Sequence, residues 1–467
     1  MVTHFDVTQP PNPLRHGHAV PCHRTGTIVT TAFRTTISST ASIARSRQTR
    51  DIVVIDDLAG FKALRPAWED LHARDPQAGV FLSWDWLYQL FADNHGQWRV
   101  LAATDPNQPD RFTAFLPLRY RLHWSSAQRR FQAYIAAAGR LCFSEYTGFV
   151  CDPDPLREAQ ALTALGQCAA QLPWARLSLR YEPTGHRLVR FAAALGGRGF
   201  DVAWPPYTIN DGATNQLLCP QIALPASHDA YLAGLSRNTR KKIRKATRRH
   251  IDSGVVRVGS AADTDPQDVR ERLLALWSAR WAAENSPARL DLIAGKYRTM
   301  MIRAEALGLL YMPSLWRGDR MLGALAFVID APRGMAHCLL TGRDDRVDDL
   351  DIGLLMHSQA IHAAISAGLR TYDFGHGTEA YKYHYGAVDR AVGYLAVTRR
   401  DADADTRFDP LLLPQALART AEMLGRGRTR DAQAALSQLA RAAAPSSGHS
   451  SAVVSSPVSP STTSSSA

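Results

Sequence analysis

The pattern of apolar and polar residues predicts a strand–helix–strand unit in the second half of the chain. An apolar run over Met335–Leu340 has strand length, and an acidic loop separates it from an amphipathic helix over about Asp351 to Ala367. A second short strand follows over Thr371–Phe374. Strands in this order pair in parallel through a right-handed crossover. Ligands of such units bind outside the carboxyl ends of the strands, so we expect the functional site there.

The periodicity on either side of this unit predicts a mixed α/β protein. In the first half, strands are expected at 52–55, 98–103, 112–119 and 176–181, and helices at 58–74, from 83, at 155–172 and at 186–195. In the second half, strands are expected near 216–224, 255–258, 309–316, 321–329 and 392–398, and helices at 265–284, 290–307 and within 411–443. Hairpin turns before the crossover predict an antiparallel meander.

The two ends of the chain have the composition of disordered segments. Residues 1–50 hold six arginines, four histidines and a single acid, Asp6. This segment faintly resembles an organelle transit peptide, but a flexible arm or a misplaced start codon explains it as well. From Pro445 onward 11 of 23 residues are serine, which predicts a disordered tail.

Length, charge and cysteine usage narrow the class of protein. A chain of 467 residues predicts two or three domains, and a net charge of +11 favours anionic partners. No stretch of about 18 apolar residues occurs, which argues against a membrane-spanning helix, and the N-terminus lacks the apolar core of a secretory signal. The six cysteines are irregularly spaced, as expected for reduced thiols in a cytoplasmic protein.

Two stretches resemble a known family. They are LSRNTRKKIRKATRRHIDSGVVRV, a basic helix running into a strand, and GLRTYDFGHGTEAYKYHYG, at the end of the crossover unit. Together with the element order, they resemble the GNAT acyltransferase superfamily and its BioF2-like or CelD-like branch, which is tied to cellulose and exopolysaccharide synthesis. Both stretches are also similar to the Fem family of peptidoglycan aminoacyl transferases, which are tandem GNAT-like proteins.

This resemblance implies an α/β (α+β) fold of two tandem GNAT-like domains, each a mixed sheet flanked by helices, with disordered termini. The expected division is a basic arm over 1–50, a degenerate N-terminal domain over 51–205, an acyltransferase domain over 206–405, a helical appendage over 406–444 and a Ser-rich tail over 445–467.

The resemblance also implies an acyl-CoA co-substrate, held through its pyrophosphate near the start of the crossover helix. The implied contacts are the side chains of Arg343 and Arg346 and the backbone amides near Gly353 and Leu354. The sequence departs from the usual Q/R-x-x-G-x-G/A loop, since only Gly353 stands in this region. Five aspartates between 344 and 351 oppose an anion, so a solvated acidic loop that caps the helix is the alternative.

The implied catalytic set consists of four residues, which lie at the end of the second strand and shortly after it. Tyr381 occupies the position of the usual GNAT proton donor to the leaving thiolate, and Glu379 or Asp373 is the expected base. Lys382 is expected to stabilise developing negative charge, as the matching lysine does in Fem-like enzymes. The alternatives are that the tyrosines are core residues and that Lys382 pairs with Glu379. The oxyanion donor is expected at a β-bulge around 340–342, with which Gly342 is compatible.

No metal site is expected. His357 and His362, or His376 and His384, lack the one-face spacing and the third ligand that a metal site needs.

The basic helix allows three interpretations. It holds eight cations in the thirteen residues 237–249, with no acid. It could contact nucleic acid or tRNA, face a polyanionic or lipid-linked acceptor, or be a solvated face.

The sequence and the resemblance together allow three functions for the protein. The first is an acyl-CoA-dependent N- or O-acetyltransferase acting on a sugar-like, cell-envelope or exopolysaccharide acceptor. The others are a Fem-like transferase that uses aminoacyl-tRNA, and a non-catalytic accessory protein of a polysaccharide machine.

Overall fold

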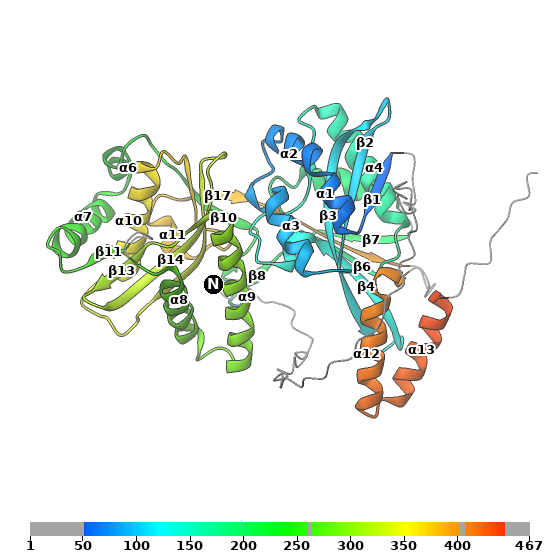
Figure 1. Cartoon of the computed structure of the whole chain (residues 1–467). Coiled ribbons are helices and arrows are strands. Elements are labelled where there is room, and N and C mark those ends of the chain that lie inside the picture. Colours follow the sequence, from blue (N-terminus) through cyan, green and yellow to red (C-terminus); the bar gives the residue numbers. More distant parts are fainter. Residues whose placement is uncertain (1–50, 198, 260–263, 401–406, 444–467) are drawn as a thin grey trace, which may run out of the picture.

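The computed structural model describes residues 51–443, except 198, 260–263 and 401–406 (Figure 1). The arm over 1–50 and the tail over 445–467, both expected to be disordered, lie outside the described residues. Two eight-stranded mixed sheets stand side by side, with helices on their faces, as the resemblance to tandem GNAT-like proteins predicts (Figure 1). Among the described helices, none combines the length and the apolar character needed to cross a membrane.

The first sheet has the strand order β1-β2-β3-β4-β6-β18-β7, and β5 pairs with β3. Its strands are β1 (Ile52–Ile55), β2 (Trp98–Asp105), β3 (Gln108–Ser125), β4 (Arg130–Ala137), β5 (Val150–Cys151), β6 (Arg176–Glu182), β7 (Phe200–Ala203) and β18 (Gly393–Arg399). Helices α4 (Pro155–Gln171) and α5 (His186–Ala194) cover one face, and their apolar residues share a core with that face.

The second sheet has the order β11-β13-β14-β15-β16-β10-β17, and β12 pairs with β14. Its strands are β10 (Leu218–Ala223), β11 (Arg257–Gly259), β12 (Leu310–Tyr311), β13 (Ser314–Arg317), β14 (Arg320–Asp330), β15 (Met335–Arg343), β16 (Thr371–Asp373) and β17 (Val388–Ala391). A short hairpin of β8 (Thr208–Ile209) and β9 (Thr214–Asn215) lies in the connection between the halves. The expected meander of β13, β14 and β15 is confirmed.

The predicted crossover unit is also confirmed. β15 and β16 pair in parallel, and α10 (Ile352–Ser366) connects them. The side chain of Asp351 caps the start of α10, and Gly368 follows its end with φ +72°, a conformation that glycine adopts without strain. α10, α6 (His228–Gly234) and α7 (Arg237–Ala246) share a core with one face of the second sheet.

A third apolar core joins the two halves. Residues of α1 (Leu58–Ala63), α2 (Arg65–Arg74) and α3 (Trp84–Asp93) pack in one cluster with residues of α8 (Pro266–Trp281) and α9 (Pro287–Ala306). The same cluster contains Leu339 and Leu340 of β15. The first half of the chain therefore buries part of the crossover unit.

The last strand leaves the second half. The strand expected at residues 392–398 lies within the expected domain over 206–405. It corresponds to β18, which pairs with β6 and β7 of the first sheet. Leu395 and Val397 of β18 belong to the apolar core of that sheet. Helices α12 (Leu413–Gly425) and α13 (Thr429–Ala443) contribute to the same core (Figure 1). The sheets therefore do not divide at residue 405, because the apolar residues of β18 are buried by the first half.

Candidate active site

The strands β15 and β16 separate at a β-bulge. Their parallel pairing ends at His337 and Asp373. On the other side of β15, Cys338 pairs with Phe327 and Leu340 pairs with Ala326, so Leu339 is the inserted residue. An inserted residue has no Cα partner on the neighbouring strand, so Leu339 interrupts the regular pairing of β15 with β14.

A cavity of about 60 Å³ lies at this bulge. Its lining comes from α8, α9, β15 and the segment after β16, and consists of Trp277, Tyr297, Cys338, Leu339, Leu340, Thr341, Phe374 and Tyr381. The lining is apolar apart from two tyrosine hydroxyls, a threonine and a thiol. Burial raises the pKa of the Cys338 thiol to about 12, so this group is not a thiolate at neutral pH.

The bulge lies beside the expected position, but Gly342 does not form it. Gly342 pairs in register with Ala324. A Cβ atom on Gly342 would lie 2.8 Å from the carbonyl oxygen of Leu273 in α8. The glycine therefore allows a close approach of α8 to the strand, and the bulge lies at Leu339.

Tyr381, which lies on α11 (Ala380–Tyr383), lines the cavity. Its ring lies 5.7 Å from the ring of His357 and 6.3 Å from that of Phe374. The residue is 39% exposed, so it connects the cavity to solvent. Partial burial of the ring raises the pKa of Tyr381 above its ordinary value, and the hydroxyl is protonated at neutral pH.

Asp373 lies at the end of β16 and is not among the residues that line the cavity. Its Oδ2 atom accepts hydrogen bonds from the Tyr146 hydroxyl at 2.5 Å and from His337 Nδ1 at 2.9 Å, and its Oδ1 atom accepts one from the Gly375 amide at 2.8 Å. Burial opposes ionisation, but these hydrogen bonds outweigh it and lower the pKa of Asp373. The geometry favours a carboxylate that organises its surroundings over a base that meets a substrate.

Lys382 and Glu379 form a pair below the loop 375–377. The Nζ atom of Lys382 lies 2.9 Å from Glu379 Oε2, 2.8 Å from the His376 carbonyl oxygen and 2.9 Å from the Gly377 carbonyl oxygen. The lysine side chain is fully buried. All three of its protons have acceptors within the protein, so this geometry favours the structural alternative, in which Lys382 holds the loop.

A carboxyl group from the first half of the chain lies beside the bulge. A Cβ atom on Gly375 would lie 3.3 Å from Oε2 of Glu145 and 3.0 Å from the carbonyl oxygen of Cys338. Among the described residues, Glu145 Oε2 has no hydrogen-bond partner, although His376 Nε2 lies 3.1 Å away. Burial and the nearby charge of Asp373 raise the pKa of Glu145 to about 8.

The neighbours of Glu145 keep it in place. His376 Nε2 donates a hydrogen bond of 2.6 Å to the Glu145 carbonyl oxygen, and its Nδ1 atom lies 3.1 Å from Cys219 Sγ. Burial lowers the pKa of His376 to about 3, so its ring is neutral. Glu145 is not among the site residues expected from the sequence, because its position beside the bulge depends on contacts between residues more than 200 positions apart.

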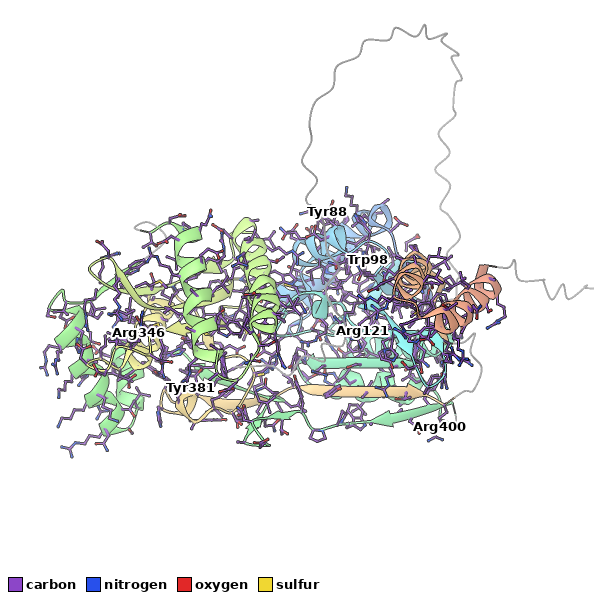
Figure 2. The ribbon with its side chains drawn as sticks, turned by 90° about the horizontal axis from the view of Figure 1, so that it is seen from below. Tyr88, Trp98, Arg121, Arg346, Tyr381 and Arg400 are labelled. Carbon is purple, nitrogen blue, oxygen red and sulfur yellow. The ribbon has the colours of Figure 1, made fainter. Side chains whose placement is uncertain are left out.

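Two of the four expected pyrophosphate contacts come together. A Cβ atom on Gly353 would lie 3.4 Å from Arg343 Nη1, so this guanidinium lies over the first turn of α10. The amide of Leu354 is already satisfied by Asp351 Oδ1 at 3.0 Å. Arg346 binds Asp344 at 2.8 Å and its side chain is 81% exposed (Figure 2). Arg343 likewise binds Asp345 at 2.8 Å, but its position over Gly353 and its lower exposure of 46% favour Arg343 and Gly353 over Leu354 and Arg346 as part of an anion site.

A larger hollow of about 580 Å³ lies on the α8 side of this loop. Its charged lining residues are Arg272, Arg280, Arg320, Arg343, Asp344, Asp345 and Arg346. Five guanidinium groups and two carboxylates give the hollow a net positive charge.

No group of three potential metal ligands occurs among the described residues. Of the histidines considered as ligands, His357 contacts the Tyr372 hydroxyl at 2.8 Å and His362 stacks on His228.

Comparisons with known proteins agree with this architecture. Residues 237–383 match the family described as an acetyltransferase (GNAT) domain. The crystal structure of FemX is similar to 71% of this chain and 95% of its own, with a TM-score of 0.50 and 13% identity. No curated protein matches the chain by sequence.

Two further solved structures are similar over much of the chain. A tandem GNAT protein from the clavulanic acid biosynthesis pathway has 12% identity and a TM-score of 0.41, over 76% of this chain and 100% of its own. L-PGS from Bacillus licheniformis has 11% identity and a TM-score of 0.38, over 75% of this chain and 94% of its own. The family match over residues 237–383 lies within the second half of the chain and includes α7, α10 and the parallel strands β15 and β16.

Proposed function

We propose that the protein transfers an acyl group, such as acetyl, from an acyl-CoA to an amine or hydroxyl of a sugar-like or cell-envelope acceptor. The observation that carries this proposal is the cavity at the Leu339 bulge, because both the inserted residue Leu339 and Tyr381 line it. The proposed catalytic part is the second sheet with its helices, which leaves β18 out of the expected domain over 206–405. The domain over 51–205 is proposed as a degenerate copy that shapes the acceptor site.

The cavity supplies groups for two steps of acyl transfer. The Leu339 amide would donate a hydrogen bond to the thioester oxygen as negative charge develops on it. When the carbon–sulfur bond breaks, the Tyr381 hydroxyl would give its proton to the leaving sulfur. The apolar walls from Trp277 and Phe374 exclude water and strengthen both interactions.

Glu145 is the proposed base for the attacking group. Its ionised carboxylate would take the proton of the acceptor amine or hydroxyl as the new bond forms. A pKa of about 8 suits this role near neutral pH, and among the described residues Oε2 accepts no hydrogen bond, with His376 Nε2 at 3.1 Å as its neighbour. Glu379 and Asp373, the bases expected from the sequence, have buried internal partners, so we assign them with Lys382 to positioning the loop 375–377.

The proposed donor site uses the first turn of α10. Arg343 lies over Gly353, and the first amides of a helix lack partners within it, so a pyrophosphate could be held there. The support for a sugar-like acceptor is the resemblance of two stretches to the BioF2-like or CelD-like branch. An acyl-CoA supplies the thioester, and the chain supplies hydrogen-bond donors and a base.

A titration with acetyl-CoA tests this proposal. Calorimetry should show one saturable site, and Tyr381→Phe should leave its dissociation constant within about twofold, because the hydroxyl acts on the leaving group. Release of free thiol from acetyl-CoA in the presence of amino sugars would then be measured. Absence of binding at millimolar acetyl-CoA would contradict the proposal.

A second candidate uses aminoacyl-tRNA as the donor. The exposed cations of α7 and the turn after it favour it, because none of them forms an ion pair within the described part of the chain; they are Arg237, Lys241, Lys242, Arg244, Lys245, Arg248 and Arg249. Binding to tRNA phosphates would weaken steeply with salt. Filter binding of charged tRNA, with and without Lys241→Gln and Lys242→Gln, separates the two donors.

A further inference from the structure

One face of the first sheet carries arginines where the opposite face carries apolar residues. On β3, Leu118, Tyr120 and Leu122 point into the apolar core. Side chains alternate along a strand, so Arg119 and Arg121 point to the other face. β6 repeats the pattern. We call this surface the arginine face; it comprises Arg119, Arg121, Arg140, Arg176 and Arg180, with Tyr134 and Tyr394.

Small residues separate these arginines. In the strand register, Arg119 pairs with Ala136, Ala136 with Ser178, and Ser178 with Ala396. A row of short side chains therefore crosses three neighbouring strands beside Arg119. The guanidinium groups on both sides of this row are not separated by bulky side chains.

The two innermost arginines have no carboxylate partner within the described residues. Arg119 donates to the carbonyl oxygen of Arg140 at 2.8 Å, and Arg180 donates to the Tyr394 hydroxyl at 3.3 Å. Their Nε atoms are buried without a hydrogen-bond partner in the same part of the chain. By contrast, the buried Arg187 binds Asp75 and Glu158 at 2.8 Å each. Buried cations are normally paired in this way.

The cations also repel one another. Burial and the charges of Arg140, Arg121 and Arg180 lower the pKa of Arg119. Burial and the charges of Arg119 and Arg140 lower the pKa of Lys296 on α9. Guanidinium groups stay protonated at neutral pH, so the positive charges persist. A bound anion would relieve this repulsion and satisfy the free N–H groups.

The arginine face continues to the candidate active site. The Arg140 guanidinium lies 5.5 Å from the centre of the Tyr181 ring, and that ring stacks on His376 at 3.7 Å. Lys296 precedes Tyr297, which lines the cavity at the bulge. An anion held by Arg119, Arg140 and Arg180 would therefore lie on the same side of the protein as Glu145.

The tyrosines of this face are already covered. Tyr134 stacks with His123 at 4.4 Å, and the guanidinium groups of Arg121 and Arg176 lie 5.4 and 5.5 Å from its centre. Arg180 lies 4.2 Å from the Tyr207 ring and 4.6 Å from the Tyr394 ring. Stacking on nucleobases needs free aromatic faces, so this arrangement favours a non-nucleotide anion over single-stranded RNA.

We propose that the arginine face binds a phosphate or carboxylate group of the acceptor and thereby directs its nucleophile towards the cavity at Leu339. The assignment of the ligand as the acceptor rests on the proposed function, whereas the anion site itself does not. Guanidinium forks suit both kinds of anion, since each presents two or three oxygens in one plane. The acceptor would thus be a phosphorylated or acidic saccharide.

Binding of two probes tests the site directly. Pyrophosphate and tri-galacturonate are titrated by calorimetry with coenzyme A in excess, so that the donor site does not compete. We expect at least one probe to saturate a single site, with the tighter probe identifying the anionic group. Arg119→Gln with Arg180→Gln should weaken it by about tenfold or more. Lys241→Gln with Lys242→Gln removes the same charge from α7 and should change nothing.

Three outcomes would overturn the inference. They are no saturable binding of either probe, equal losses in the two double variants, or an RNA oligonucleotide that binds more tightly and depends on the same arginines. Thermal unfolding checks folding, and Arg121→Gln alone offers a milder variant on the same face. Acetyl-CoA binding is measured on every variant. If the protein binds the anionic probe but does not bind acetyl-CoA, the proposed function is rejected and the anion site is retained.

Discussion

The hydroxyl of Tyr146 donates a hydrogen bond of 2.5 Å to the carboxylate of Asp373, and the two residues are 227 positions apart. Tyr146 belongs to the first half of the chain and Asp373 ends β16 of the crossover unit. Gln221 Nε2 also contacts the Tyr146 hydroxyl at 3.0 Å. This buried contact ties the loop that carries Glu145 to the strand beside the cavity, so it links the two halves at the candidate active site.

Tyr146→Phe should destabilise the protein through this contact. It leaves a buried carboxylate one donor short, which costs roughly 1.5–3 kcal/mol of unfolding free energy. Urea unfolding at pH 7 measures the change. Tyr383→Phe is the matched control, because Tyr383 makes an exposed hydrogen bond of 2.7 Å to Asp389. The control should stay within about 0.5 kcal/mol of the parent protein. Equal losses of unfolding free energy in the two variants would show that the buried hydrogen bond of Tyr146 stabilises the protein no more than the exposed one of Tyr383.

Glu145→Gln should lower turnover by roughly 10²–10⁴-fold, because a carboxamide cannot accept the proton of the acceptor. The parent enzyme should show a matching pH profile. Burial raises the pKa of Glu145 to about 8, so the fraction of active carboxylate grows as pH rises towards 8 and levels off above it. Activity per enzyme at limiting acceptor, followed from pH 6 to 9, measures both effects.

The control for Glu145 is Glu271→Gln. Glu271 pairs with Arg298 at 2.7 Å on the surface, and its removal should leave the pH profile unchanged. The residual activity of Glu145→Gln should lack the inflection near 8. If that variant keeps both the rate and the inflection, another group is the base.

The sequence predicted the parts of this site that depend on local pattern. Met335–Leu340 and the helix after it follow from hydrophobic periodicity, and the parallel pairing of β15 with β16 follows from their connection. Tyr381 lines the cavity because it lies a few residues after β16. These features need only neighbours along the chain, so they can be inferred without knowing the tertiary contacts.

Other features depend on contacts that no local pattern specifies. β18 has ordinary strand periodicity, and only its partners β6 and β7 show that it belongs to the first sheet. The bulge at Leu339 carries no glycine, since its position is set by register with β14. Glu145 meets the bulge from the other half of the chain. The sheet partners of β18, the position of the bulge and the position of Glu145 can therefore be identified only from the three-dimensional structure.

Tyr381→Phe should lower kcat while leaving the KM for acetyl-CoA nearly unchanged. The hydroxyl is proposed to protonate the leaving sulfur, so its loss affects the transition state, with an expected decrease of about 10²-fold. Steady-state kinetics separates kcat from KM. Tyr383→Phe, two residues along the same short helix, again serves as the control. An increase in KM without a change in kcat would contradict the proposed role.

Lys382→Met should destabilise the protein by roughly 3–5 kcal/mol, because it leaves Glu379 and two carbonyl oxygens of the loop 375–377 without their buried donor. Adding Glu379→Gln should recover part of this loss, since it removes the uncompensated carboxylate. Denaturant unfolding of both single variants and the double variant gives the coupling between the two residues. Additive effects would mean that the pair is not coupled, and a normal stability with lost turnover would return Lys382 to a catalytic role.

Arg343→Gln should weaken acetyl-CoA binding more than Arg346→Gln. Arg343 lies over the first turn of α10 and near Gly353, whereas Arg346 is 81% exposed and bound to Asp344. A charge-assisted hydrogen bond to phosphate contributes about 1.5–3 kcal/mol, so Arg343→Gln should raise the dissociation constant by roughly ten- to a hundredfold. Arg346→Gln should change it by less than about threefold, because the Arg346 side chain is 81% exposed, whereas that of Arg343 is 46% exposed. Calorimetry at two salt concentrations measures both, and the Arg343 effect should shrink at high salt. Equal effects of the two substitutions would move the pyrophosphate away from Gly353 and towards the larger hollow beside α8.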